Sequence, residues 1–191
     1  SGVVNVTDVG SFTVADPSLL TTGIFNIAAN KSIILAPTAA KTLGATTLVT
    51  AGSGKLVLNA DTSARVVTVP STSNITAVTN IELTRGQLKI TGESELSTSA
   101  VITTAASNTT LDIAASQSIA TLTHSGAMAI ASEKTLTQTG TAASVIAGVI
   151  TGAGTYTFNN SAMAVTWGSD ISGFSGVVNV TDVGSFTVAD P

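Results

Sequence analysis

The chain contains no cysteine, one histidine and few charged or aromatic side chains. Disulfide scaffolds and thiolate metal sites are therefore excluded, because both require cysteine sulfur. Charged residues make up 9% of the 191 residues, against roughly 25% in ordinary globular domains. The seven Lys and Arg residues are scattered and form no basic patch of the kind that binds nucleic acid phosphates. We therefore expect no nucleic acid partner.

The sequence also lacks a hydrophobic run long enough to cross a membrane. Residues 135–169 carry no charge, but the apolar centre of this segment, residues 142–154, is short. A spanning helix needs roughly 20 apolar residues. We therefore predict no membrane span.

Hydroxyl and apolar side chains take the place of the missing charge. Thr supplies 33 of the 191 residues, and 43% of the chain is apolar. The high apolar content argues against disorder, while Thr and Val favour the pleated, half-buried surface of a strand. We therefore predict an all-β chain.

The first seventeen residues occur again, unchanged, at the end of the chain. Residues 1–17 and 175–191 both read SGVVNVTDVGSFTVADP. This identity predicts a tandem array in which residues 1–174 form one complete unit and residues 175–191 begin the next. The alternative is an overlap added to a single domain by engineering or permutation.

A shorter pattern, Gly-x-apolar-x-apolar, recurs within the unit. It begins at Gly2, Gly23, Gly54, Gly86, Gly126, Gly154 and Gly176, and Leu111-x-Ile113 is a related copy without the glycine. The spacings between successive copies are 21, 31, 32, 23, 17, 28 and 22, and together they make up the whole unit. The long spacings predict loops or an extra strand, with Leu48-Val49 and Ile81-x-Leu83 as candidates.

Apolar residues two apart point to one face of a strand, and the polar or small residues between them indicate corners. We expect the glycines to lie at corners, where a positive φ costs little. One copy cannot bury its apolar face alone, whereas stacked copies can. We therefore predict a parallel β-helix (β-solenoid) of about seven rungs per 174-residue unit. Paired Ig-like sandwiches are the alternative, although they give no reason for one motif to recur so often.

Three segments carry a resemblance to a known family: NIELTRGQLKIT (80–91), TLTHSGAMAIAS (121–132) and ITGAGTYTFNN (150–160). They resemble the β-helical passenger repeats of bacterial autotransporters and related giant surface adhesins, and the resemblance covers most of the unit. It implies a right-handed parallel β-helix that is secreted and displayed at the cell surface. It implies no particular ligand.

Few residues could carry catalysis or bind a metal ion. His124 has no catalytic partner beside it in the sequence, and we expect it at a corner or on the outer surface. Glu93 and Glu95 could form a carboxylate pair, as in glycosidases and calcium sites, although a solvated turn is the simpler interpretation. Arg65 and Arg85 belong to different rungs, which argues against the charged cluster of polysaccharide lyases. We predict no catalytic residue, no cofactor and no metal site, and therefore no enzyme.

Two further features have simple structural interpretations. Tyr156 occupies an inward position, and we expect Trp167 to pack in the core or at an edge rather than against a sugar. The pairs Thr121-x-Thr123 and Thr135-x-Thr137 are too few to indicate the Thr ladders of ice-binding solenoids.

Together these features predict a structural unit of an extracellular filament or stalk-like surface protein, built by stacking β-solenoid units end to end. The expected partners are neighbouring copies of the repeat, in the same chain or in self-assembled chains, joined through their terminal rungs. An adhesin module that recognises a host surface or glycan is the alternative. Residues 175–191 should adopt the conformation of residues 1–17. Seven rungs at about 4.8 Å would advance each unit by about 34 Å.

Overall fold

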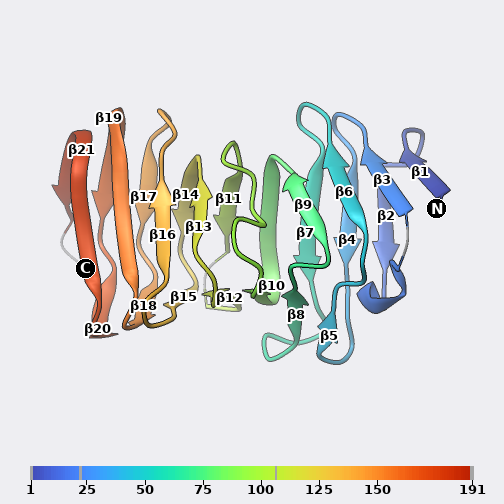
Figure 1. The fold of residues 1–191 in the computed structure, drawn as a ribbon, viewed down its shortest axis with the longest axis horizontal. Coiled ribbons are helices and arrows are strands. Elements are labelled where there is room, and N and C mark those ends of the chain that lie inside the picture. The colour runs from blue at the N-terminus through green and yellow to red at the C-terminus, as the bar shows by residue number, and fades with distance from the viewer. Residues whose placement is uncertain (1, 22, 106, 190–191) are drawn as a thin grey trace.

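The computed structural model describes residues 2–21, 23–105 and 107–189, and it is a parallel β-solenoid of about nine turns. Strands account for 59% of the described residues, which contain no α-helix and one short 3-10 helix, η1 (Pro17–Leu19). The turns lie side by side along the long axis, with β1 at one end and β21 at the other (Figure 1). The predicted fold class is confirmed.

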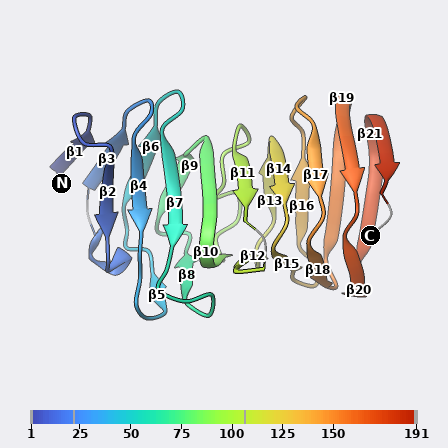
Figure 2. The ribbon, with the colours of Figure 1, turned by 180° about the vertical axis from the view of Figure 1, so that it is seen from behind.

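A complete turn passes three faces, which we call A, B and C in the order that the chain visits them (Figures 1 and 2). The first turn forms no strand on face C, and residues 91–100 form none on face A. Face A consists of β1 (Gly2–Val6), β3 (Gly23–Ile27), β6 (Thr47–Thr50), β9 (Asn74–Ala77), β13 (Gln117–Ile119), β16 (Thr135–Gln138) and the first parts of β19 (Thr155–Trp167) and β21 (Val177–Val188). Face B consists of β2 (Ser11–Val14), β4 (Ser32–Leu35), β7 (Lys55–Asn59), the first part of β10 (Asn80–Ile90), β11 (Val101–Thr104), β14 (Thr121–His124), β17 (Ser144–Ile146) and the last parts of β19 and β21. Face C consists of β5 (Lys41–Thr42), β8 (Val66–Val69), the last part of β10, β12 (Thr109–Ile113), β15 (Ala127–Ile130), β18 (Val149–Gly152) and β20 (Asp170–Phe174).

Face B carries an unbroken ladder of nine parallel strands. One column of paired residues runs through it from Val14 to Val188, and we call it the Val14 column. Its members are Val14, Leu35, Leu58, Leu83, Thr104, His124, Ile146, Trp167 and Val188. Eight steps therefore lead from the first turn to the last. Antiparallel sandwiches have no such ladder, so the alternative of paired Ig-like sandwiches is wrong.

The unit makes one turn more than the seven rungs that the motif indicates, because the motif moves between faces. Its copies begin strands of face A at Gly2 and Gly23, then face B at Gly54. The next three copies lie on face C, and the motif returns to face A at Gly154. The three long spacings, of 31, 32 and 28 residues, each span one turn and a third, so each moves the motif to the next face. The three extra thirds add up to the one additional turn. The predicted extra strands are confirmed as β6 and the first part of β10.

The last turn repeats the placement of the first turn with one local difference. β1 and β2 lie on faces A and B, and β21 crosses the same two faces as a single strand. Residues 159 and 160 of β19 pair with β21 through this corner. In the second turn, the corner that lies beside residues 7–10 is a tight turn at Asn30, whose φ is 62°. This corner offers no strand edge, so residues 7–10 do not form a strand.

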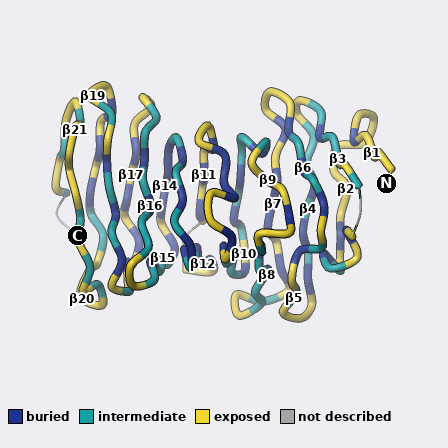
Figure 3. The backbone as a smooth tube through the Cα atoms, in the orientation of Figure 1, coloured by how far each residue is buried: buried dark blue, intermediate teal, exposed yellow. Residues whose placement is uncertain are grey.

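The core is one continuous cluster of inward side chains that extends from Val14 to Trp167 and includes residues of all three faces. Strands such as β4, β8, β15 and β16 alternate buried and half-buried residues, as a sheet with one face inward requires. Figure 3 shows the buried positions along the interior and the exposed ones at the corners and the two ends. Outward positions are mostly polar or small, and many of them are Thr rather than charged residues.

The glycines of the motif mostly serve close packing rather than an unusual backbone angle. Among them, the expected positive φ occurs only at Gly86, at 107°. A Cβ at Gly54 would lie 2.7 Å from the carbonyl oxygens of Ile27 and Ala28, and one at Gly154 would overlap the carbonyl oxygen of Ala131. Successive corners therefore approach so closely that no side chain fits between them.

We expect Gly154→Ala to lower the free energy of unfolding by about 2 kcal/mol or more, because the new methyl group would have to push two turns apart. Chemical denaturation followed by circular dichroism measures this change. Gly168→Ala is the matched control, because its Cβ would meet only the Ala189 Cβ at 3.6 Å, and we expect a change within about 0.5 kcal/mol. Equal effects of the two substitutions would contradict the packing argument.

Candidate functional site

His124 lies on the inward side of β14 and is fully buried, so the expectation of a corner or outer position is wrong. Its Nδ1 lies 2.9 Å from the hydroxyl of Thr104, one turn earlier. That hydroxyl oxygen also accepts hydrogen bonds from the backbone N–H groups of Ser125 and Gly126, so its own proton is free for Nδ1. The imidazole proton is thereby assigned to Nε2, which finds no hydrogen-bond partner among the described residues.

Burial lowers the pKa of His124 to about 4, and a backbone interaction with Val149 counteracts only part of this shift. The side chain is therefore neutral at pH 7. Its neighbours in the Val14 column are Thr104 and Ile146. Because a hydroxyl rather than a carboxylate holds the ring, the geometry is that of a packing residue and not of a general base.

Glu93 and Glu95 do not form a carboxylate pair, because one faces solvent and the other is buried. Lys134 Nζ lies 2.8 Å from Glu93 Oε1, and the Ser116 N–H donates to Oε2 at 2.6 Å. The hydrogen bond from Lys134 is the main reason that the pKa of Glu93 is lowered. Burial raises the pKa of Glu95. Glu93 thus ties neighbouring corners together, as a structural residue would.

Six other charged side chains also join one turn to another. Ion pairs between turns link Lys41 to Asp16 at 2.5 Å, Lys55 to Glu82 at 2.8 Å, and Lys89 to Asp112 at 3.1 Å. Arg65 pairs within its own corner with Asp61, at 2.9 Å, and Arg85 lies at the corner of β10 one turn later. Such partly exposed pairs stabilise only weakly, and in the described part of the chain they leave no concentrated positive site for a substrate.

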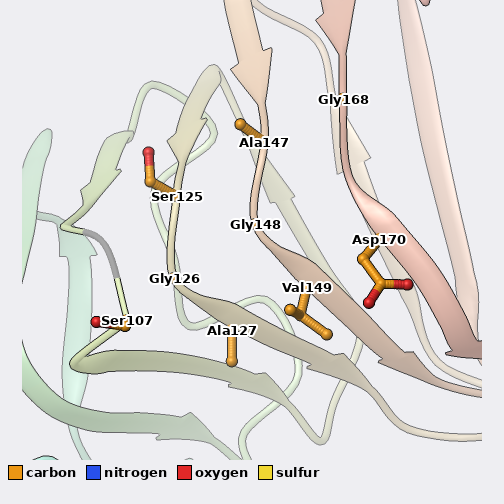
Figure 4. A pocket seen from close by; sticks show the side chains of 9 residues that line it. All are labelled: Ser107, Ser125, Gly126, Ala127, Ala147, Gly148, Val149, Gly168 and Asp170. Atoms are coloured by element: carbon orange, nitrogen blue, oxygen red, sulfur yellow. The ribbon is translucent and has the colours of Figure 1, made fainter. Parts of the chain in front are cut away.

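A groove of about 460 Å³ follows the corners between faces B and C (Figure 4). Its lining comes from four successive turns: Ser107, Ser125, Gly126, Ala127, Ala147, Gly148, Val149, Gly168 and Asp170. Asp170 is the one charged residue of this lining, and its carboxylate already accepts a hydrogen bond from the Ser172 N–H at 2.8 Å. The small side chains that line the groove are those that let the corners stack, and they present no converging polar groups of the kind that fix a ligand.

The aromatic residues mark a different region, the two ends of the coil. The chain has seven aromatic residues and none between Phe25 and Tyr156. In the first two turns, Phe12 and Phe25 lie with ring centroids 6.4 Å apart. In the last two turns, four rings form what we call the C-terminal aromatic cluster, with centroids 4.5–6.1 Å apart: Tyr156, Phe158, Trp167 and Phe186. Trp167 is buried there, as expected.

Apolar side chains are exposed at both ends, whereas the same columns are buried between them. Phe12 is 39% exposed, but its partner one turn later, Ile33, is fully buried. At the other end, Val188 is 72% exposed, although Trp167 beneath it is only 7% exposed. No part of the chain that the structure describes covers the outer edges of β1, β2 and β21. Exposed strand edges with apolar residues are typical sites for pairing with another strand.

The two ends are therefore the candidate functional site. The sequence pattern predicted the terminal rungs as an interface but not the aromatic cluster there. The signal was available in the long stretch without aromatic residues between Phe25 and Tyr156. Within residues 2–21, 23–105 and 107–189, no group of three or more His, Asp or Glu side chains could hold a metal ion. The same ranges contain no helix long and apolar enough to cross a membrane.

Protein-family profiles, curated proteins and solved structures were compared with this chain, and none of them matches it. The resemblance to autotransporter passenger repeats therefore stays a prediction.

We expect the free energy of unfolding to fall as the pH is lowered from 7 to 5. His124 has a pKa of about 4 when folded and about 6.5 when unfolded, so the unfolded chain binds the extra proton in this range. The loss should be about 2 kcal/mol. Urea denaturation at several pH values measures it.

The control is His124→Leu, which removes the titrating group but keeps an apolar side chain in the column. Its stability should stay nearly constant between pH 7 and 5, whatever its value at pH 7. A variant that still loses stability over this range would show that another group is responsible.

Proposed function

We propose that the chain is a structural repeat unit of an extracellular filament or stalk-like surface protein in which β-solenoid units continue end to end. The observation that carries this proposal is the Val14 column. It ends on Val188, which is the counterpart of Val14 in the next copy of the repeat. Because a whole number of turns separates the two, a following copy would enter every column in the register of the first.

The position of the aromatic residues supports the same proposal. In an array, the rings of Tyr156, Phe158 and Trp167 would lie beneath the Phe12 and Phe25 of the next unit. Aromatic side chains bury more surface than others and gain from edge-to-face and offset contacts. The strongest packing would thus lie where one unit meets the next, and the exposed apolar edges of the isolated chain would be covered.

The proposed role is mechanical rather than catalytic. In a solenoid each turn contacts only its neighbours, so stability grows with every added turn and the backbone hydrogen bonds lie along the axis. The extracellular location rests on the resemblance to passenger repeats. An adhesin module is the alternative, in which the repetition of weak sites would give avidity.

We expect two joined units, residues 1–174 followed by residues 1–191, to form one continuous rod. Eight turns at about 4.8 Å make it about 38 Å longer than the single chain, with an unchanged cross-section. Cryo-electron microscopy measures the length and width.

The control joins the same two units through a flexible Gly/Ser linker of about 20 residues, which should behave as a random coil. This protein should give two bodies at variable angles. If the directly joined protein also forms two such bodies, the filament proposal fails. Binding of the directly joined protein to host cells or glycans would instead favour the adhesin.

A further inference from the structure

We propose that β1 and β2 of a second copy of this chain can take the place of β21 on the edge of β19, so that separate chains join end to end by strand exchange. The proposal does not require that the units are joined in one polypeptide. It rests on an identity: residues 177–188, which cover β19, have the same sequence as residues 3–14, which form an open edge at the other end.

The contacts that hold β21 in place are contacts that the first turn can also make. Phe186 packs against Phe158 and Trp167, with ring centroids 5.8 and 6.1 Å apart. Ten residues of β21 pair in parallel with β19, from Val177 opposite Thr155 to Val188 opposite Trp167. In an incoming chain, Phe12 would fill the position of Phe186, and its neighbour Phe25 would extend the aromatic stack.

The free-energy balance of this exchange is close to even, and two terms favour it. The pairing with β19 is lost once and formed once, with identical residues. The exchange also covers the exposed edge of β1 and β2, where Val3 and Phe12 are 58% and 39% exposed. The displaced residues 175–189 regain conformational entropy, which offsets the entropy lost on association. Any change that weakens β21 alone should therefore drive assembly.

A simpler mode of association would give the opposite result. The first turn of one chain could stack on β21 of another without displacing it, placing Phe12 over Phe186. A substitution in β21 would weaken that contact. Strand exchange requires instead that the same substitution strengthens assembly, because the altered residue leaves with the displaced segment.

The first test is Phe186→Asp in the full chain. A carboxylate has no partner in the aromatic cluster, so β21 should detach and the β19 edge become free. We expect the fraction of dimers and longer oligomers in sedimentation velocity to rise about tenfold. The matched control is the double variant Phe12→Asp/Phe186→Asp, which frees the same edge but cannot supply the apolar donor, and it should be monomeric. Fewer oligomers in the single variant, or equal oligomers in both, would overturn the proposal.

The second test locates the contact by disulfide trapping, which the absence of native cysteine makes specific. Thr157 pairs with Asn179 in the chain, and Asn5 is the counterpart of Asn179. A Thr157→Cys/Phe186→Asp chain should therefore form a disulfide-linked heterodimer with an Asn5→Cys chain, since neighbouring strands lie within disulfide reach.

Face B provides the matched pairs for this experiment, through Thr166, which pairs with Thr187, the counterpart of Thr13. A Thr166→Cys/Phe186→Asp chain should form a disulfide with a Thr13→Cys chain. A Thr157→Cys/Phe186→Asp chain should form none with that Thr13→Cys chain. Strand exchange predicts the two matched combinations and excludes the mismatched one. Equal linking in all combinations, or none in the matched ones, would overturn it.

Discussion

An inward side chain of an inner turn stacks on a residue of the turn before and carries one of the turn after, because parallel strands lie about 4.8 Å apart. This spacing is the constraint on which the other features depend. It explains why motif glycines such as Gly154 stand where any side chain would meet the backbone of another turn. It also explains why the charged residues pair mostly between turns, as Lys55 and Glu82 do. Each inward residue must therefore fit the size and the hydrogen-bonding groups of the residues one turn away.

The few polar residues in the core meet this constraint through hydrogen bonds between turns. The Gln138 amide group donates to the Tyr156 hydroxyl at 2.6 Å, and its carbonyl oxygen accepts from the Leu122 N–H at 3.1 Å. Gln117 likewise accepts from the Leu96 N–H at 2.9 Å and donates to the Gly92 carbonyl at 2.7 Å. Burial raises the pKa of Tyr156, so the hydroxyl stays protonated. Buried polar groups that are satisfied in this way fix the register of the turns against which they bond.

The sequence was sufficient for the fold class and for many corners, because both follow from residues close together in the chain. The long spacings predicted loops or an extra strand at Leu48-Val49 and Ile81-x-Leu83, and both segments are strands. The number of turns was not predicted correctly, because Gly-x-apolar-x-apolar marks the start of a strand without saying on which face it lies. The inward position of His124 was missed for a related reason. The buried position of the His124 side chain depends on a hydrogen bond with the Thr104 hydroxyl one turn earlier. No local sequence pattern shows that these two residues share a column. The sequence shows that the aromatic residues lie near the two ends of the chain. That four of them form one cluster follows only from the pairing of β19 with β21.

The whole number of turns in each unit has an effect on the outside of the molecule as well. A feature on the surface, such as the groove beside Gly148 and Asp170, would return at the same angular position in each successive copy, apart from the twist of the coil. A filament of such units would have a front and a back, with one row of grooves along a single side. Since all its strands run in the same sense around the axis, its two tips would also differ chemically, and it could grow or attach at one tip without doing so at the other.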